Sequence, residues 1–392
     1  MTQDFIAAHV IPELERLSAQ GLTRRIPDVD RGADKFLMFE GHRLLNLASN
    51  NYLGLAGHEE LARAASEAAL GLGTSSGASR LVTGTYPLYA ALEAELAQFK
   101  NCQAALVLNS GYAANLAAVT IVADRNTVVF SDRLNHASIV DAIRLSGAEH
   151  ARYRHGDLDH LSRLLVANKD WPRKVLVSDS VFSMDGDRAD LAGIIERCRD
   201  HGVFLILDEA HATGVLGQGR GLAAELGLER EIGLSMGTFS KALGSLGGYL
   251  TGRREVVDLL IAKARSFIYT TALPPAVIGA NLAALRHVAA HPDLGTRLLA
   301  MAWDFRERVQ ALGFSTEPSS TQIVPVVFGG NAETLAAKEF LMRRGVYAPA
   351  IRPPTVPSGT ARLRLSLRAD LTAQDLDLAV NALADLARES KK

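Results

Sequence analysis

The chain has 392 residues and a formal net charge of -1, because 42 Lys and Arg residues nearly balance 43 Asp and Glu residues. Hydrophobic residues make up 48% and charged residues 22%, a balance that excludes intrinsic disorder and a fibrous repeat. Since the chain has no excess of positive charge, the composition argues against a nucleic-acid partner and against an anionic membrane surface.

The N-terminal segment and the cysteines point to the cytoplasm. Residues 1–17 carry acidic groups in an amphipathic helical pattern, which differs from the basic and apolar pattern of a secretory signal. The uncharged stretch 101–123 contains Asn109, Ser110 and Gly111, so it favours a strand, a turn and a helix over a membrane span. The two cysteines are isolated from each other and from any Cys/His motif. We expect a cytoplasmic protein without a metal.

Short apolar runs alternate with helical patterns along the first two thirds of the chain. The runs that predict buried strands are 104–108, 127–130, 174–177 and 203–207. Helical patterns such as 86–99 and 191–201 separate them. This alternation is typical of a parallel sheet that helices cover on both faces. The predicted fold class is α/β, with one large, mostly parallel sheet.

The pattern changes after about Pro274. Long helical segments, a strand at 323–328 and an alternating strand at 361–367 predict a smaller α+β domain, and the alternation predicts that one face of the last strand is wet. We therefore expect three parts: a helical arm with a short strand, the α/β domain and the C-terminal domain, at residues 1–50, 51–289 and 290–392.

The run VFLILDEAHATG (203–214) places Asp208 and His211 directly after a predicted buried strand. In open α/β sheets, ligands bind at the carboxyl ends of the strands. A simpler reading is that Asp208 caps the following turn. Asp-Glu-Ala-His also occurs in one class of helicases, but that class needs a Gly-rich phosphate loop ending in Gly-Lys, and the sequence contains no Gly-Lys pair.

The segment 235–250, SMGTFSKALGSLGGYL, surrounds Lys241 with small and hydroxyl residues. Most lysines are solvated surface groups. Small neighbours allow a cofactor to approach the backbone, and a desolvated lysine has a lowered pKa that suits Schiff-base formation with an aldehyde. Together with Asp208 and His211, this segment suggests pyridoxal phosphate. A non-catalytic phosphate-binding module is the alternative that these residues alone leave open.

Several motifs in order make the suggestion specific. They are LNLASNNYLGL (45–55), SSGASRLVTGT (75–85), LNSGYAAN (108–115), SDRLNHASI (131–139), SVFSMDGD (180–187), LDEAHATG (207–214) and TFSKALGSLGG (238–248). From about Leu44 to Leu367 the chain resembles the α-oxoamine synthases, which are fold-type I pyridoxal-phosphate transferases. The resemblance implies a large, mostly parallel-sheet domain with a smaller α+β C-terminal domain.

The resemblance also implies roles for matching residues. Lys241 would bind the cofactor aldehyde, Asp208 would pair with its ring nitrogen, and His136 would stack on the ring and act as an acid. His211 and Ser183 would contact the phenolic oxygen. The residues expected near the phosphate are Ser110, Gly111, Tyr112, Thr238 and Ser240 of one chain, with Thr270 and Thr271 reaching across from a second chain. A homodimer with shared active sites follows.

The substrate is suggested by the run AIRPPTVPSGTARLRLS (350–366), in which Arg352 precedes a Pro-Pro turn and could grip a carboxylate. The run is most similar to members that join L-alanine to a pimeloyl thioester, on CoA or a carrier protein, in biotin biosynthesis. Asn50 would help to hold the carboxylate and Thr355 would contact substrate. The alternatives are members that join glycine to acetyl-CoA, the glycine C-acetyltransferases, and other members that join an acyl-CoA to an amino acid.

The chain departs from the family pattern at three places. Close relatives use an N-terminal arginine near the acyl substrate, and here either Arg24 or Arg25 could serve. Asp179 stands where a glutamate is frequent, and Ser240 stands where a glycine often precedes the lysine. These departures concern acyl specificity and the packing of the cofactor more than the class of reaction.

Overall fold

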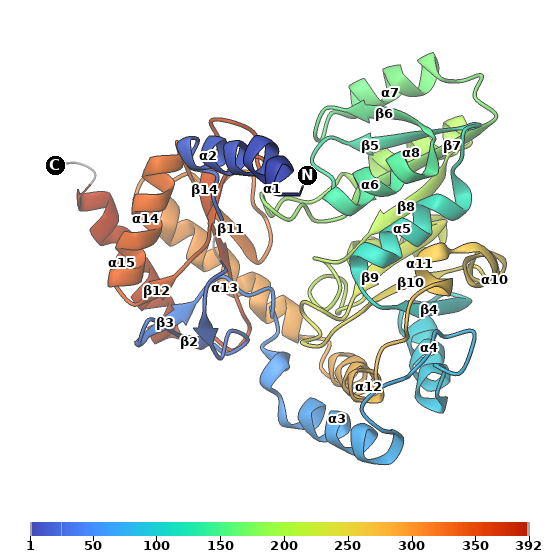
Figure 1. Ribbon diagram of the computed structural model, residues 1–392, viewed down its shortest axis with the longest axis horizontal. Coiled ribbons are helices and arrows are strands. Elements are labelled where there is room, and N and C mark those ends of the chain that lie inside the picture. The colour runs from blue at the N-terminus through green and yellow to red at the C-terminus, as the bar shows by residue number, and fades with distance from the viewer. Residues whose placement is uncertain (1, 25, 390–392) are drawn as a thin grey trace.

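The computed structural model describes residues 2–24 and 26–389, and it has a large α/β lobe and a smaller lobe that contains the C-terminal residues (Figure 1). The N-terminal arm consists of α1 (Thr2–Phe5), a π-helical turn (Ile6–Val10) and α2 (Ile11–Ala19). It lies against the smaller lobe in Figure 1. The strands that follow are β1 (Val29–Asp30), β2 (Phe36–Phe39) and β3 (His42–Asn46).

The large lobe is built on a seven-stranded sheet with the order β4-β10-β9-β8-β7-β5-β6. Its strands are β4 (Ala104–Leu108), β5 (Thr127–Asp132), β6 (Glu149–Tyr153), β7 (Arg173–Asp179), β8 (Phe204–Asp208), β9 (Leu234–Thr238) and β10 (Gly248–Gly252). The strands from β9 to β6 are parallel, and β10 is antiparallel to both of its neighbours. The predicted α/β class with a mostly parallel sheet is therefore confirmed.

Helices cover both faces of this sheet. Their bounds are α3 (Glu59–Leu72), α4 (Pro87–Phe99), α5 (Gly111–Val122), α6 (Ala137–Ser146), α7 (Leu158–Ala167), α8 (Leu191–His201), α9 (Leu222–Glu225), α10 (Arg254–Lys263), α11 (Arg265–Ile268) and α12 (Pro275–Ala290). Along β8, Leu205 and Leu207 join one hydrophobic core, and Ile206 joins the other. Because both faces are buried, the strand sequences are continuous apolar runs rather than alternating ones.

The smaller lobe combines segments from both ends of the chain. Its C-terminal part contains α13 (Leu294–Ala311), β11 (Ile323–Gly329), α14 (Asn331–Arg343), β12 (Val346–Tyr347), β13 (Ala350–Ile351), β14 (Ala361–Ser366) and α15 (Ala373–Glu389). Since β12 pairs in parallel with β3, the N-terminal strands complete a four-stranded sheet, and β11, β14 and β13 form a second sheet. The predicted boundary between residues 289 and 290 falls at the last residue of α12, four residues before α13 begins. The three-part division stays a prediction.

The expectation of a wet face on the last strand was wrong. All six residues of β14 are buried, including Arg362 and Arg364. The polar face of the strand turns toward the large lobe, where Arg362 pairs with Asp185 and Arg364 donates to the Ser183 carbonyl. Docking of the two lobes therefore buries a surface that the local pattern presents as polar.

No helix among the residues described by the structure is long and apolar enough to cross a membrane.

Candidate active site

The carboxyl ends of the parallel strands meet at a cavity of about 170 Å³ in the large lobe. Its walls come from the N-terminus of α5, the loop before α6, the ends of β7, β8 and β9, and the loop after β9. The lining residues are Gly111, Tyr112, Asn115, His136, Ser138, Asp179, Asp208, Ala210, His211, Met236, Thr238, Ser240 and Lys241. The fold thus brings together most of the residues that the sequence predicts for a cofactor.

Lys241 lies in the connection between β9 and β10. Burial lowers the pKa of its ammonium to about 8; Asp208 and Asp179 oppose this shift, and Arg364 adds to it. Among the described residues, none makes a hydrogen bond or an ion pair with Lys241 Nζ. A substantial fraction of this amine is therefore neutral and nucleophilic near neutral pH.

Asp208 ends β8 and its carboxylate is held at both oxygens. Asn115 Nδ2 donates to Oδ2 at 2.8 Å, and the Ala210 amide donates to Oδ1 at 2.9 Å. Only 4% of Asp208 is exposed. The Asn115 side chain comes from α5 and also donates to Ser138 at 2.9 Å, so α5 fixes the carboxylate in one orientation. The sequence analysis did not find Asn115, because an asparagine inside an apolar helix gives no local signal.

His136 caps α6, and its Nδ1 lies 2.7 Å from Ser138 Oγ. Burial lowers the pKa of His136, and Lys241 contributes in the same direction. Its backbone amide donates to Asp179 at 3.2 Å. Burial, reinforced by Asp208, raises the pKa of Asp179 well above its usual range. The pKa shifts thus favour the neutral form of the His136 imidazole and of the Asp179 carboxyl beside Asp208.

A hydrogen-bonded chain connects His211 to the smaller lobe. His211 Nδ1 lies 2.7 Å from the Tyr52 hydroxyl, which donates to Asn50 Oδ1 at 3.1 Å. Arg364 Nη1 donates to Asn50 Oδ1 at 3.1 Å, and Nη2 donates to the Tyr52 hydroxyl at 3.1 Å. Burial, with the charges of Lys241 and Arg364, lowers the pKa of His211 well below its usual range. His211 is therefore neutral.

The N-terminus of α5 faces the cavity. Ser110 caps the helix by accepting from the Ala113 amide at 3.1 Å, which leaves the amides of Gly111 and Tyr112 in the first turn without a helical partner. A Cβ atom on Gly248 would lie 2.4 Å from the Ser110 carbonyl, so only glycine lets β10 approach this turn. A helix N-terminus with free amides is suited to an anion.

Thr238 and Ser240 shape the lysine-bearing connection. Thr238 donates to the Gly247 carbonyl at 2.6 Å, and its hydroxyl accepts from the Ser240 amide at 3.1 Å. Ser240 Oγ accepts from the Gly247 amide at 3.1 Å. The hydroxyl groups therefore hold the two ends of the connection together, beside the cavity that both residues line.

Arg364 is the residue that the sequence analysis missed, and Arg352 lies elsewhere than that analysis expected. Arg352 Nη1 donates to the Gly21 carbonyl in the N-terminal arm, and Arg352 is not among the described residues that line the cavity. Arg364 is buried and donates a hydrogen bond to Asn50. Its positive charge contributes to lowering the pKa of Lys241 and of His211. The alternating sequence of residues 361–367 predicts an exposed polar face, so it gives no reason to expect a buried arginine at position 364.

A second cavity of about 600 Å³ shares His136 with the first. Ser183 and Thr355 line it, from the SVFSMDGD segment and the segment after the Pro-Pro turn. Arg24 Nη2 donates to Thr355 Oγ1 at 3.3 Å, which brings the N-terminal arm to its rim. Arg25 lies outside the described residues. The predicted substrate residues Arg24 and Thr355 thus lie around one space. Ser183, which was predicted to contact the phenolic oxygen of the cofactor, lines this second cavity and is not among the described residues that line the first.

Thr270 and Thr271 lie next to the end of β4 in their own chain. Asn109 Nδ2 donates to the Thr271 carbonyl at 2.5 Å and to Thr270 Oγ1 at 3.5 Å. Thr271 also forms an antiparallel bridge with Ser79. The two threonines are not among the described residues that line the chain's own cavity. Their role across a subunit interface stays a prediction.

The residues present fit pyridoxal phosphate. The α5 N-terminus offers amides for a phosphate, Asp208 offers a carboxylate for a ring nitrogen, and Lys241 offers a free amine for an aldehyde. Two buried oxygens in the cavity wall, Asn115 Oδ1 and Asp179 Oδ1, have no hydrogen-bond partner. Buried polar atoms of this kind are typical of a site built for a polar ligand.

Comparison with known proteins agrees with this geometry. Residues 42–383 match the family described as aminotransferase class I and II. An 8-amino-7-oxononanoate synthase of Geobacter metallireducens is 50% identical over 380 residues, which are 96% of this chain and 97% of the relative. The enzyme of the same name from Geobacter sulfurreducens is 48% identical over 380 residues, with the same coverage of 96% and 97%.

Solved structures show the same likeness. A serine palmitoyltransferase of S. paucimobilis, solved with a bound PLP adduct, superposes with a TM-score of 0.92 at 28% identity, over 100% of this chain and 99% of that chain. An 8-amino-7-oxononanoate synthase of Francisella tularensis gives a TM-score of 0.76 at 26% identity, over 88% of this chain and 98% of that chain.

Proposed function

The chain belongs to the aminotransferase class I and II family, and from this premise we propose that it acts as an 8-amino-7-oxononanoate synthase. The fold-type I transferase fold and the resemblance to the α-oxoamine synthases are confirmed. The reaction joins L-alanine to a pimeloyl thioester and releases carbon dioxide and the free thiol. The observation that carries the proposal is the buried Lys241, with its lowered pKa, beside Asp208 at the carboxyl ends of the strands.

The cofactor supplies an electron sink that stabilises negative charge at the substrate Cα. The chain supplies the rest. Asp208, fixed by Asn115 and the Ala210 amide, places a carboxylate where a ring nitrogen needs a negative partner. His136, held by Ser138, is positioned to cover the ring, and the amides of Gly111 and Tyr112 are suited to the phosphate.

Lys241 performs two tasks. Its lowered pKa would make the amine available to hold the cofactor aldehyde when the cofactor is bound. The same amine would serve as the general base for the alanine Cα proton, since a base with a pKa near the working pH transfers protons most effectively. His136 lies on both cavities, so it would meet the thioester carbonyl as a neutral imidazole that can donate a hydrogen bond, because its lowered pKa argues against the protonated acid that the resemblance implies.

Arg364 and Asn50 hold the alanine carboxylate in this proposal. A buried guanidinium with fixed partners offers bidentate hydrogen bonds in one orientation, which sets the direction of the Cα–H bond. Arg352 instead fastens the N-terminal arm at the Gly21 carbonyl. The cavity of about 600 Å³ receives the acyl chain, with Thr355 and Arg24 at its rim.

We also propose a homodimer with shared active sites in the cytoplasm. Large apolar side chains are exposed around the segment 75–85 and the threonines; they are Leu70, Leu72, Leu81, Val82 and Tyr269. The bridge between Ser79 and Thr271 joins these segments into one surface. An exposed apolar patch of this kind is typical of a subunit interface. Burying it against a second copy would carry Thr270 and Thr271 toward the other cavity.

Val82→Asp tests the dimer. Val82 is 73% exposed, so the aspartate disturbs an interface without disturbing the core of one chain. We expect monomers by sedimentation and loss of turnover. Val166→Asp, at the 58% exposed Val166 of α7, is the matched control and should stay dimeric and active. A monomeric wild-type protein with full turnover would contradict the shared site.

The reaction is tested by the release of free thiol. The purified holoenzyme is given alanine, glycine or serine with pimeloyl-CoA, acetyl-CoA or palmitoyl-CoA, and 8-amino-7-oxononanoate is identified by mass spectrometry. Alanine with pimeloyl-CoA should give the highest kcat/KM. Preference for glycine with acetyl-CoA, or for serine with palmitoyl-CoA, would refute the proposed substrate pair while keeping the class of reaction.

A further inference from the structure

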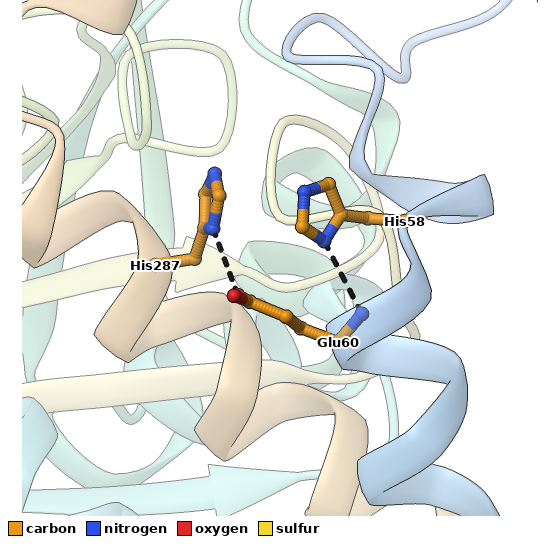
Figure 2. A group of neighbouring side chains, drawn as sticks. All are labelled: His58, Glu60 and His287. Carbon is orange, nitrogen blue, oxygen red and sulfur yellow. Dashed lines mark hydrogen bonds and ion pairs between the residues drawn. The ribbon is translucent and has the colours of Figure 1, made fainter.

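Three titratable side chains gather outside the active site, where α3 begins and α12 ends (Figure 2). His58 caps α3, Glu60 lies in its first turn, and His287 lies in the last turn of α12. One ligand atom of each residue lies within 4.8 Å of the other two. None of the three is among the described residues that line either active-site cavity.

The contacts hold the group together. His287 Nδ1 lies 3.1 Å from Glu60 Oε2, and His58 Nδ1 accepts from the Glu60 amide at 3.4 Å. Figure 2 shows the two imidazole rings side by side above the Glu60 side chain, with His287 on one helix and His58 at the start of the other. The ring of His287 lies 4.5 Å from that of His58 and 4.4 Å from that of His291, centroid to centroid. Three imidazole rings thus lie close together, with tilted planes, and His58 and His287 both contact Glu60.

The donor set is chemically selective. Two imidazole nitrogens and one carboxylate oxygen are the ligands that zinc and related divalent ions prefer, whereas magnesium and calcium prefer oxygen ligands. The His287 side chain is only 13% exposed, which restricts its orientation, while Glu60 at 54% has room to move.

We propose that His58, Glu60 and His287 bind one divalent transition-metal ion of the zinc class. Zinc bonds of about 2.0–2.1 Å require tetrahedral ligand atoms about 3.3 Å apart. The exposed Glu60 carboxylate supplies most of the required movement. Water takes the fourth position, with His291 as the neighbouring imidazole. The ion joins two helices that are already packed together, and its role is structural.

An ion bound at His58, Glu60 and His287 would affect catalysis only indirectly, by stabilising the helices that carry these residues. The turn before α3 carries Asn50 and Tyr52, and α12 leads into α13 of the smaller lobe. An ion that binds the folded chain and not the unfolded chain stabilises the folded state in proportion to the logarithm of its concentration. Zinc should therefore raise the thermal midpoint of the holoenzyme without being required for turnover.

The test is calorimetric titration of tag-free holoenzyme with zinc chloride. We expect one ion per chain. In His287→Gln and in Glu60→Gln the affinity should fall at least tenfold and the rise in thermal midpoint should disappear. His42→Gln, which changes an exposed histidine at the start of β3, is the control and should bind zinc like the wild type.

Cobalt gives a second readout. Its visible absorption bands report four-coordinate geometry, and they should appear in the wild type and in His42→Gln and be absent in His287→Gln. Glu60 is exposed, so Glu60→Gln keeps the test valid if the His287 variant fails to fold. Equal zinc affinity in the wild type, His287→Gln and Glu60→Gln would overturn the proposal, as would the absence of any binding to the wild type.

Discussion

Two lysine-carboxylate groups lie on opposite faces of the end of β8, and they differ in one respect. Asp208 turns toward the cofactor cavity and Lys241, whereas Glu209 turns to the other face and Lys100. Lys100 Nζ lies 2.5 Å from Glu209 Oε2, and both side chains are almost completely buried. Lys241 makes no such contact with any residue that the structure describes.

The contact decides what each lysine can do. Burial alone would lower the pKa of Lys100, but its interactions with Glu209, Tyr249 and Cys102 together outweigh burial and raise the pKa. Glu209 also accepts hydrogen bonds from the Ala223 amide at 3.0 Å and from the Ser235 hydroxyl at 3.3 Å. The protein itself therefore supplies the hydrogen-bond partners of the Glu209 carboxylate. At Lys241 burial prevails, and the pKa falls to about 8. The paired Lys100 therefore has a structural role, whereas the unpaired Lys241 stays available for chemistry.

Replacing Lys241 should have the largest effect. Lys241→Ala removes the amine that captures the cofactor and the base that takes the Cα proton, so turnover should fall to the level of a protein-free blank. The visible absorbance of lysine-bound pyridoxal phosphate should disappear after dialysis. Lys263→Ala, at an exposed lysine of α10, is the control and should keep both properties. Turnover in Lys241→Ala would contradict the assigned role.

Replacing Glu209 should instead affect stability. Glu209→Gln leaves the Lys100 ammonium buried without its counter-charge, and breaking a buried pair on one side costs about 3–5 kcal/mol. The measurement is the free energy of unfolding in urea at saturating cofactor. Glu95→Gln, which opens the exposed pair with Arg286, should cost only about 0–1 kcal/mol. An equally small cost for both variants would remove the contrast between the two lysine groups.

Much of the fold and half of the site follow from the sequence because the signals are local. Residues 104–108 and 204–208 are continuous apolar runs since both faces of those strands are buried. Lys241 and Asp208 stand in short motifs of unusual composition. Arg364 gives no such signal, because its burial comes from the docking of β14 against residues more than three hundred positions away. The same reason hides the Lys100–Glu209 pair.

Arg364 also distinguishes the surroundings of Lys241 from those of Lys100. Its positive charge adds to the effect of burial and lowers the pKa of Lys241 further. Arg364→Gln should raise the KM for alanine about 10- to 100-fold, since hydrogen bonds to a charged group contribute about 1.5–3 kcal/mol. Arg352→Gln should leave that KM within about twofold and instead loosen the N-terminal arm, detected by proteolysis before residue 24. The reverse pattern would show that Arg352, and not Arg364, binds the alanine carboxylate.

The last prediction concerns the pH at which Lys241 loses its proton. Only the neutral amine attacks an aldehyde, so capture of pyridoxal phosphate by the apoenzyme should accelerate about tenfold per pH unit and level off near pH 8. An ordinary lysine, with a pKa of 10.5, continues to accelerate through that range. At pH 7 about one Lys241 in ten is neutral, against about one ordinary lysine in three thousand.

Stopped-flow absorbance gives the capture rate, and dividing it by the rate for Nα-acetyllysine in the same buffers removes the ionisation of pyridoxal phosphate itself. The ratio should be largest at low pH and should fall between pH 8 and 10.5, as the reference amine loses its proton after Lys241 has lost its own. A ratio that stays constant with pH would mean that Lys241 titrates like an ordinary lysine. Lys241 and Lys100 would then differ only in geometry. The cavity would make Lys241 accessible to the aldehyde, but burial would not have lowered its pKa.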